Sequence, residues 1–147
     1  MKEIEVKKIQ KISTPDGNMV PIFRDWDFDT NLGHKPKMVY ATSLDPGIEK
    51  DIILHERRTA YTTCIQGAVR VDALVNGKIQ EIELDFENSN DQINLLLIPS
   101  NVPIKIYNVS KNTSILINCP NPSWHPDDPD TIKFKDWSEY KKWQSED

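Results

Sequence analysis

The stretch AVRVDALVNGKIQEIEL, residues 68–84, consists of two runs of alternating apolar and polar residues joined by one Asn-Gly pair. A period of two places every second side chain on the same face of an extended chain, so each run predicts a half-buried strand. Asn76 and Gly77 predict a two-residue turn, because both positions of a type I′ turn need a positive φ. Residues 68–84 are therefore predicted to form a β-hairpin.

Short apolar runs separated by turn residues continue on both sides of this hairpin, and we expect about ten strands in all. Turns are expected at 15–18 and 45–47, where Pro, Asp, Gly and Asn gather. This rhythm of short strands indicates an all-β sandwich or barrel. The other predicted strands are residues 4–12, 19–24, 37–44, 51–55, 60–66, 94–98, 103–108 and 113–119.

The C-terminal part of the chain lacks this rhythm. The Pro-rich stretch 119–130, CPNPSWHPDDPD, is expected to end the β region, because proline disfavours both strand pairing and helix formation. The tail 136–147, DWSEYKKWQSED, predicts a short helix with Asp136 as its N-cap and Glu139 completing a capping box.

Composition limits the classes of partner. The net charge of −5 argues against a nucleic-acid partner, which requires a basic face. No apolar run approaches the roughly 20 residues of a membrane helix, and the start, MKEIEVKKIQ, carries charges where a signal peptide is apolar. We therefore expect a cytoplasmic protein without a membrane partner. Cys64 and Cys119 lie far apart in apolar segments and predict buried free thiols.

Two glycines and one histidine stand at a recognisable spacing. Gly47, His55 and Gly67 match the pattern Gly-x5-His-x-His-x4-Glu-x6-Gly, and Ile53 and Ala60 fill its other two positions. This spacing resembles the first sequence motif of the cupins, in which the two histidines and the glutamate bind a metal ion.

A second segment matches the pattern Pro-x-Gly-x2-His-x3-Asn. Pro99 and Asn108 match it directly, Asn101 replaces the glycine, and Ile104 replaces the histidine. Asparagine is a reasonable substitute for glycine here, because it also tolerates a positive φ. This pattern resembles the second cupin motif.

The resemblance implies an all-β fold, a cupin-type jelly-roll β-barrel with a short C-terminal helix, in a single domain of residues 1–147. Its parts would be N-terminal strands at 1–36, a barrel core at 37–120, and a Pro-rich segment with the helix at 121–147. Three of the four metal-ligand positions hold aliphatic residues, and a catalytic metal needs at least three protein ligands. We therefore expect neither a metal nor any other cofactor.

The whole chain is similar to the dTDP-4-dehydrorhamnose 3,5-epimerase group of the cupins. The likeness includes VPIFRDWD at 20–27 after the early turn, and the ending WHPDDPDTIKFKDW at 124–137. It implies a metal-free protein that handles a nucleotide-linked sugar as its small-molecule partner. It also implies a homodimer in which N-terminal strands such as 4–12 cross between subunits.

In that group a histidine, oriented by an aspartate, removes a proton next to a ketone, and a tyrosine returns one. On this chain the histidine falls on Ile53, the tyrosine on Trp124 or Ser123, the arginine that precedes the histidine on Lys50, and the aspartate on Asp136. The expected base and acid are therefore both replaced.

His55 is the candidate replacement base, because it lies two residues from Ile53 and a strand would point both side chains to the same side. A hydrogen-bonded structural histidine is the alternative interpretation. Asp136 is the candidate for orienting the imidazole, and helix capping is its alternative role. The candidate ligand-binding residues have cationic, aromatic or amide side chains: Arg24, Lys50, Arg57, Tyr107, Asn108 and Trp124, with Arg58 beside Arg57.

Three functional hypotheses follow. The first is an epimerase or isomerase that uses His55, the second a sugar-binding protein without catalysis, and the third a structural protein with a filled barrel. An open polar pocket that brings His55 within reach of Tyr107 or an arginine would favour the first two. A barrel closed by Ile53 and Ile104 would favour the third.

Overall fold

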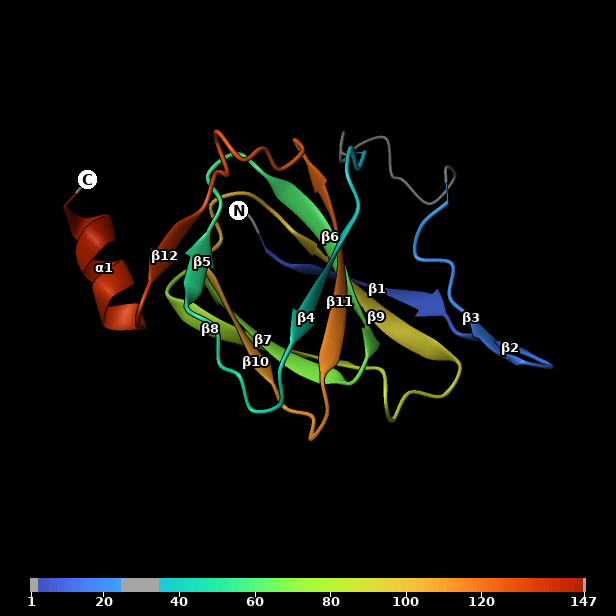
Figure 1. The fold of residues 1–147 in the computed structure, drawn as a ribbon. Coiled ribbons are helices and arrows are strands. Elements are labelled where there is room, and N and C mark those ends of the chain that lie inside the picture. Colours follow the sequence, from blue (N-terminus) through green and yellow to red (C-terminus); the bar gives the residue numbers. More distant parts are fainter. Residues whose placement is uncertain (1–2, 25–34, 147) are drawn as a thin grey trace.

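The computed structural model describes residues 3–24 and 35–146, which form two antiparallel five-stranded sheets and one helix (Figure 1). The first sheet consists, in spatial order, of β1 (Glu5–Gln10), β9 (Gln92–Ile98), β6 (Thr59–Gln66), β11 (Ser114–Asn121) and β4 (Tyr40–Leu44). The second consists of β12 (Ile132–Phe134), β5 (Ile52–Leu54), β10 (Ile104–Asn108), β7 (Ala68–Val75) and β8 (Lys78–Asp85). A small hairpin of β2 (Ile12–Thr14) and β3 (Gly17–Met19) extends away from the barrel.

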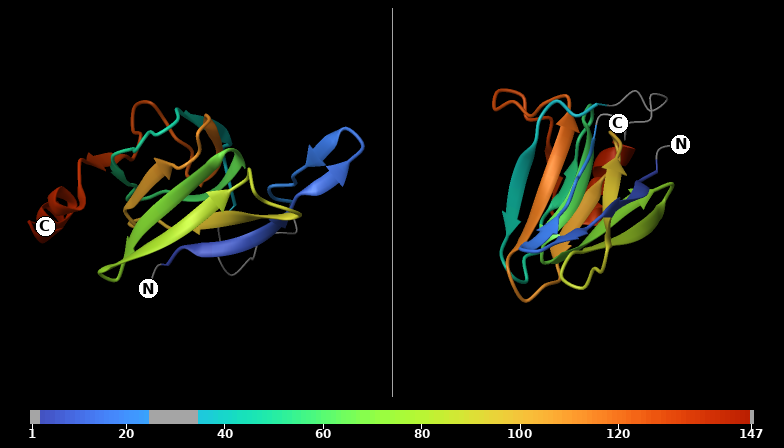
Figure 2. Two further views of the ribbon diagram at one scale, coloured as in Figure 1. Left: turned by 90° about the horizontal axis from the view of Figure 1, so that it is seen from below. Right: turned by 90° about the vertical axis from the view of Figure 1, so that its right-hand side faces the viewer.

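The two sheets face each other and enclose the main apolar core (Figure 2). Alternation places alternate residues of β7, β8, β9 and β10 in this core, as the period of two predicted. The core members include Leu44, Cys64, Leu96, Ile98 and Leu116 from the first sheet and Val69, Val71, Ala73, Ile82, Leu84, Ile104 and Ile106 from the second. The prediction of an all-β barrel with a short C-terminal helix is confirmed.

The hairpin predicted at 68–84 is present as β7 and β8. Val75 lies opposite Lys78, and the turn residues Asn76 and Gly77 have φ angles of 52° and 77°. Both angles lie in the left-handed region that a type I′ turn requires.

The motif residues that match the cupin spacing have backbone roles. Gly67 has a φ of 80°, and a Cβ atom at this position would lie 2.2 Å from Ser114 Oγ. Asn101, in the place of a glycine, has a φ of 64°. The buried amide of Asn108 donates hydrogen bonds to the carbonyl oxygens of Leu44, Asp45 and Asn112, and so joins the turn that follows β4 to the connection between β10 and β11.

The expectation that the Pro-rich stretch ends the β region is wrong. β11 continues through Pro120 to Asn121, and β12 returns afterwards to pair with β5. β4 pairs with β11 only as far as Asn118, so Pro120 has β6 as its one strand neighbour. A proline is tolerated there because its missing N–H faces no strand on the other side.

The N-terminal predictions need two corrections. The strand expected at 4–12 is divided into β1 and β2 at Lys11, whose N–H bonds to the carbonyl of Asp91. The strand expected at 19–24 stops after Met19, and Ile22 and Phe23 instead pack on the outer face of the first sheet. Residues 25–34, which include the end of the 20–27 segment, lie outside the described part of the chain.

Helix α1 (Trp137–Ser145) begins where predicted, with Asp136 as its N-cap, but the capping box is altered: Glu139 Oε2 accepts from the Lys135 N–H instead of the Asp136 N–H. The Asp136 carboxylate accepts a hydrogen bond of 2.8 Å from the Glu139 N–H. The helix lies outside the barrel beside β12, where Tyr140 packs edge-on against Phe134 with 5.3 Å between ring centroids (Figure 1). Within residues 3–24 and 35–146 there is no helix of the length and apolarity needed to span a membrane.

Both cysteines are buried and free, as predicted. Cys64 faces the main core, and Cys119 lies under the outer face of the first sheet. Burial raises the pKa of each thiol to about 11, so both stay protonated near neutral pH.

Candidate functional site

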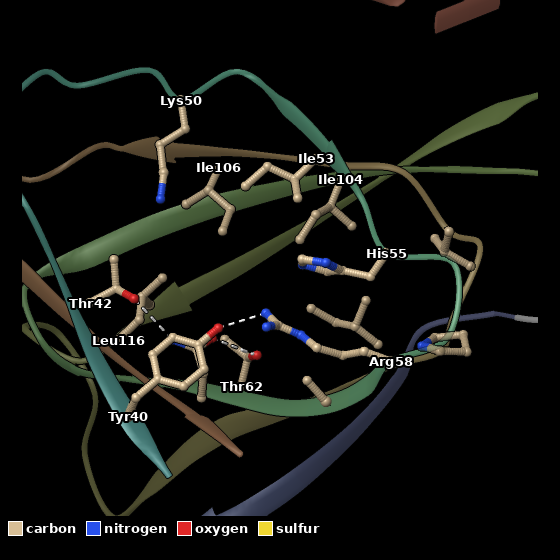
Figure 3. A pocket seen from close by; sticks show the side chains of 15 residues that line it. Tyr40, Thr42, Lys50, Ile53, His55, Arg58, Thr62, Ile104, Ile106 and Leu116 are labelled. Atoms are coloured by element: carbon tan, nitrogen blue, oxygen red, sulfur yellow. Dashed lines mark hydrogen bonds between the residues drawn. The ribbon is translucent and has the colours of Figure 1, made fainter. Parts of the chain in front are cut away.

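One end of the barrel contains an inner cavity of about 70 Å3 that continues into an outer chamber of about 440 Å3. The chamber is of the size that holds a small-molecule ligand. Six residues line both parts: Tyr40, Thr42, Lys50, Ile53, His55 and Arg58. Figure 3 shows their side chains converging on the same space.

The residues that line the cavity form two chemically different sets. We call the first the polar arc; it consists of Tyr40, Thr42, Lys50, His55, Arg58, Thr62 and Asn118. We call the second the apolar wall; it consists of Ile53, Ile98, Val102, Ile104, Ile106 and Leu116.

Strand alternation explains this arrangement. β5 ends at Leu54, and Ile53 and His55 on either side of it both line the cavity. Ile53 lies directly opposite Ile104 on β10. Ala60, near the start of β6, lines the same cavity. All four positions that hold metal ligands in the cupin motifs, Ile53, His55, Ala60 and Ile104, therefore face one cavity.

The hydrogen bonding of His55 defines its tautomer. Its Nδ1 atom lies 2.7 Å from the carbonyl oxygen of Asp130 and 3.5 Å from Thr131 Oγ1. Because a carbonyl oxygen only accepts, Nδ1 carries the hydrogen, and in the neutral ring Nε2 keeps its lone pair. Burial and the charge of Arg58 lower the pKa of His55, against the opposing effect of Asp130. The imidazole is therefore neutral near pH 7 and can accept a proton.

Arg58 and Tyr40 form a pair at the floor of the arc. Arg58 Nη2 donates a hydrogen bond of 2.6 Å to the Tyr40 hydroxyl, drawn as a dashed line in Figure 3. Since the tyrosine oxygen accepts this bond, its own hydrogen is available to another acceptor in the cavity.

A hydrogen-bond chain fixes the opposite part of the arc. The hydroxyl of Thr62 donates to Asn118 Oδ1 over 3.1 Å, and Asn118 Nδ2 donates to Thr42 Oγ1 over 3.2 Å. Thr42 accepts in this chain, so its hydroxyl hydrogen is also available to a ligand.

Two lysines give the outer chamber a positive character. Lys50 and Lys133 both line it, and Figure 3 shows Lys50 pointing inward. Burial, together with the nearby charge of Lys133, lowers the pKa of Lys50. Like charges held this close repel each other, and a bound anion would relieve the repulsion.

We find no group of three or more His, Cys, Asp or Glu side chains placed to hold a metal ion in the described ranges 3–24 and 35–146. The expectation that the protein works without a metal therefore stays a prediction, which elemental analysis of the purified protein would test.

The structure brings three of the predicted site residues together. His55, Lys50 and Trp124 all line the outer chamber. An arginine also reaches the cavity, but it is Arg58. Its neighbour Arg57 is exposed and pairs with Asp128 at 2.7 Å on the outside of the loop.

The other predicted residues lie elsewhere. Tyr107 is on the outer side of β10, with the Arg70 guanidinium 4.1 Å from its ring centroid. Asn108 bonds to turn carbonyls, as described above. Arg24 lines a separate pocket of about 140 Å3 on the outer face of the first sheet.

The orienting role expected of Asp136 belongs to another residue. Asp136 caps α1 outside the barrel, and the hydrogen-bond partner of His55 Nδ1 is the backbone of Asp130. The helix N-terminus takes the Asp136 carboxylate because its free N–H groups need an acceptor.

Several residues that the structure places at or beside the site were not predicted from the sequence, Lys133 of the outer chamber among them. Four of them, Tyr40, Thr42, Thr62 and Asn118, follow strand alternation, which would have identified them once the inward face was known. Asp130 has no such signal, because it lies in the Pro-rich segment.

Comparison with known proteins agrees with this fold. The family model described as FdtA, WxcM-like, C-terminal, matches residues 2–144. A dTDP sugar isomerase from Desulfovibrio desulfuricans G20 has a TM-score of 0.78 at 15% identity, over 92% of this chain and 86% of that one. No curated protein matches the chain.

Two further solved structures carry ligands. A mutant of the 3,4-ketoisomerase QdtA from Thermoanaerobacterium thermosaccharolyticum, in complex with TDP-4-keto-6-deoxyglucose, has a TM-score of 0.72 at 18% identity, over 99% of this chain and 94% of that one. A double mutant of ChmJ, a 3'-monoepimerase from Streptomyces bikiniensis, in complex with dTDP, has a TM-score of 0.73 at 14% identity. The match covers 88% of this chain and 68% of that one. The predicted resemblance to cupins of the nucleotide-sugar epimerase and isomerase group is confirmed.

Proposed function

Because this chain belongs to the FdtA family of WxcM-like C-terminal domains, we propose that it is an isomerase or epimerase of a nucleotide-linked keto sugar. His55 is the base that removes a proton from the carbon beside the ketone. The observation that supports this most strongly is the neutral imidazole in the cavity, with its Nδ1 hydrogen bonded to Asp130 and its Nε2 lone pair available. A base with a pKa near or below neutrality is what such a proton transfer requires.

The polar arc offers groups for the charge that develops. When the C–H proton moves to His55 Nε2, the electron pair of that bond is delocalised onto the ketone oxygen, which becomes an enolate. The hydroxyl hydrogens of Tyr40 and Thr42 and the ammonium group of Lys50 are positioned to donate to such an oxygen. If the hydroxyl group on the deprotonated carbon gives its proton to the enolate oxygen and the C–H proton returns to the former ketone carbon, the product is a keto isomer. Return of a proton to the opposite face of the original carbon gives an epimer.

The outer chamber supports binding of a diphosphate. Lys50 and Lys133 concentrate positive charge there although the protein as a whole carries a net charge of −5. A local cluster of cations can bind an anion against the average field of the protein. Trp124, which is 44% exposed at the chamber, offers a surface on which a nucleotide base can stack.

The experiment follows deuterium uptake. The protein is incubated in heavy water with dTDP-4-keto-6-deoxyglucose, and NMR follows exchange at C3 and C5 and identifies the product, while calorimetry measures dTDP binding. We expect exchange with the wild type and a loss of about 10²–10⁴-fold in His55→Asn, the size of a general-base contribution. His125→Asn is the matched control, because this exposed histidine is not among the residues that line the cavity or the chamber. Wild-type binding without exchange would contradict the proposal.

A sugar-binding protein without catalysis is the second candidate function. It is favoured by Ile53 and Ile104, which put hydrocarbon where the family resemblance expects imidazole groups. The third hypothesis, a filled barrel, expected these side chains to close the interior. The inner cavity of about 70 Å3 and its outer chamber argue against that hypothesis.

The predicted homodimer is retained as part of the proposal. β1 pairs with β9 of its own chain and lies at the edge of the first sheet. An edge strand has backbone groups free to pair with a second copy. Gel filtration or light scattering that gives the mass of a monomer would remove the homodimer from the proposal. Cytoplasmic localisation is likewise a prediction, and cell fractionation would test it.

A further inference from the structure

We propose that Asp130 is the positioning residue of this site, a single residue whose backbone and side chain together hold His55 and Arg58 in the cavity. This role rests on the proposed function, because it explains how the base and the Tyr40–Arg58 pair keep their places. Asp130 lines neither the inner cavity nor the outer chamber. It acts through the loop 55–58, which connects β5 to β6.

The carboxylate of Asp130 collects three consecutive backbone N–H groups of that loop. Oδ1 accepts from the Glu56 N–H at 3.1 Å, and Oδ2 accepts from those of Arg57 and Arg58 at 3.0 and 2.9 Å. The side chain is only 8% exposed, so these bonds are shielded from competing water. A loop whose successive N–H groups converge on one buried carboxylate has little freedom to change conformation.

The backbone of the same residue sets the imidazole. The Asp130 carbonyl accepts the Nδ1 hydrogen of His55 at 2.7 Å, which turns the Nε2 lone pair toward the cavity. Asp130 has a φ of 52°, in the left-handed region. This conformation lets Asp130 direct its carbonyl to the imidazole of His55 and its carboxylate to the backbone N–H groups of the three residues that follow His55.

The charge state of Asp130 suits this role. Burial alone would raise the pKa of its carboxyl group, but the hydrogen bonds from Arg57, Arg58 and Glu56 and the charge of Arg57 outweigh burial and lower it. The group is therefore ionised at neutral pH and can accept all three bonds.

The Pro-rich segment thus contributes to the site without lining the inner cavity. A loop joining two strands would otherwise be free to turn His55 and Arg58 together away from the substrate. Because reacting groups must be held within about an ångström, displacement of such a loop is expected to reduce turnover by about 10²-fold.

The first test is the tautomer of His55 in the wild-type protein. In 15N-detected NMR we expect Nδ1 to carry the hydrogen and Nε2 to show the shift of an unprotonated ring nitrogen. A dominant Nε2–H tautomer would overturn the proposal. This measurement needs neither a variant nor turnover.

The second test compares variants of the segment. Asp130→Gly keeps the backbone carbonyl and tolerates the positive φ, but removes the carboxylate. We expect kcat to fall about 10²-fold, KM to change less, and the Nδ1–H signal of His55 to weaken. Asp130→Asn, which also tolerates this φ and keeps the shape, should fall between Asp130→Gly and the wild type.

Asp128→Asn is the matched control. It removes the same charge from the same segment, but Asp128 pairs only with the exposed Arg57 side chain. We expect its kcat and its His55 tautomer to equal those of the wild type. The proposal would be overturned if Asp130→Gly had the kcat and the His55 tautomer of the wild type. It would also be overturned if Asp128→Asn lost as much kcat as Asp130→Gly.

The two proposals fail in different ways. If the wild type binds dTDP but exchanges no deuterium, the proposed function fails, while the NMR tautomer still reports whether Asp130 orients the imidazole. If exchange is normal and insensitive to Asp130→Gly, the positioning role fails and the proposed function stands.

Discussion

The polar arc and the apolar wall line the same cavity but are built from different parts of the strands. Five of the six wall residues lie in strands held by regular pairing, as where Ile53 lies opposite Ile104. Several members of the arc lie instead at a strand end or in a loop, where side chains need other partners. The side chain of His55 is hydrogen bonded to Asp130, and that of Arg58 is hydrogen bonded to Tyr40.

The difference separates polar groups that can bind or react from aliphatic groups that only shape the cavity. Aliphatic side chains on the wall exclude water and lower the local dielectric constant, which strengthens every hydrogen bond made from the arc. Changes in the arc should therefore affect turnover and binding, whereas changes in the wall should affect mainly stability.

Among the variants that compare the arc with the wall, the largest effect is expected for Tyr40→Phe. It removes one hydroxyl from the arc, and we expect kcat for exchange to fall about 10²–10³-fold, as for loss of a donor to a developing oxyanion. Steady-state kinetics by NMR measures it. Tyr107→Phe is the control, because that ring lies on the outer side of β10. Equal kcat values for wild type and Tyr40→Phe would remove the tyrosine from the mechanism.

A change in the wall should act on stability instead. Ile104 is 6% exposed, and Ile104→Ala should lower the free energy of unfolding by about 2–5 kcal/mol through lost contacts and a cavity. Urea unfolding measures it, with Ile79→Ala as the control, since Ile79 is 44% exposed and should change stability by no more than about 0.5 kcal/mol. A loss of turnover without a loss of stability in Ile104→Ala would erase the contrast between wall and arc.

Binding should depend on the cations of the arc. Lys50→Met removes one of the two lysines of the outer chamber, and we expect the Kd for dTDP to rise about tenfold. Calorimetry at low and high salt measures it, and the difference should shrink at high salt because salt screens the charges. Lys78→Met, in the exposed hairpin turn, should leave Kd unchanged.

The smallest effect concerns pH. The charge of Arg58 is one of the causes that lower the pKa of His55 from its ordinary value of 6.5, so Arg58→Gln should raise it. Protonated His55 cannot accept a proton, so activity falls as the pH drops through this pKa, and the fall should begin at higher pH in the variant. NMR titration of His55 measures the shift directly.

Arg57→Gln is the control for the pH experiment. The Arg57 guanidinium pairs with Asp128 at 2.7 Å and lies 3.9 Å from Asp130, and Arg57 is not among the residues that line the cavity or the chamber. The charged groups around the imidazole are Arg58 and Asp130, with Lys50 and Lys133 in the shared chamber. A shift of the same size in Arg57→Gln would mean that the effect is not local to the cavity.

Much of the fold could be predicted because its signals are local. The hairpin at 68–84, the N-cap at Asp136 and the positive φ at Asn101 each depend on the chemistry of a few neighbouring residues. β12 could not be predicted, because a strand of three residues has almost no periodicity and pairs only where β5 offers an edge.

By itself, the sequence determined that this chain is an all-β barrel with one histidine and aliphatic residues at the positions that hold metal ligands in cupins. Spacing along a strand determines which side chains share a face, so His55 and Ile53 could be placed together from the sequence. Only the tertiary structure decided what surrounds them. Asp130 is 75 residues from His55 along the chain, and Tyr40 is 18 residues from Arg58. Contacts of this kind depend on how strands far apart in sequence are brought together, and no local pattern of residues records that.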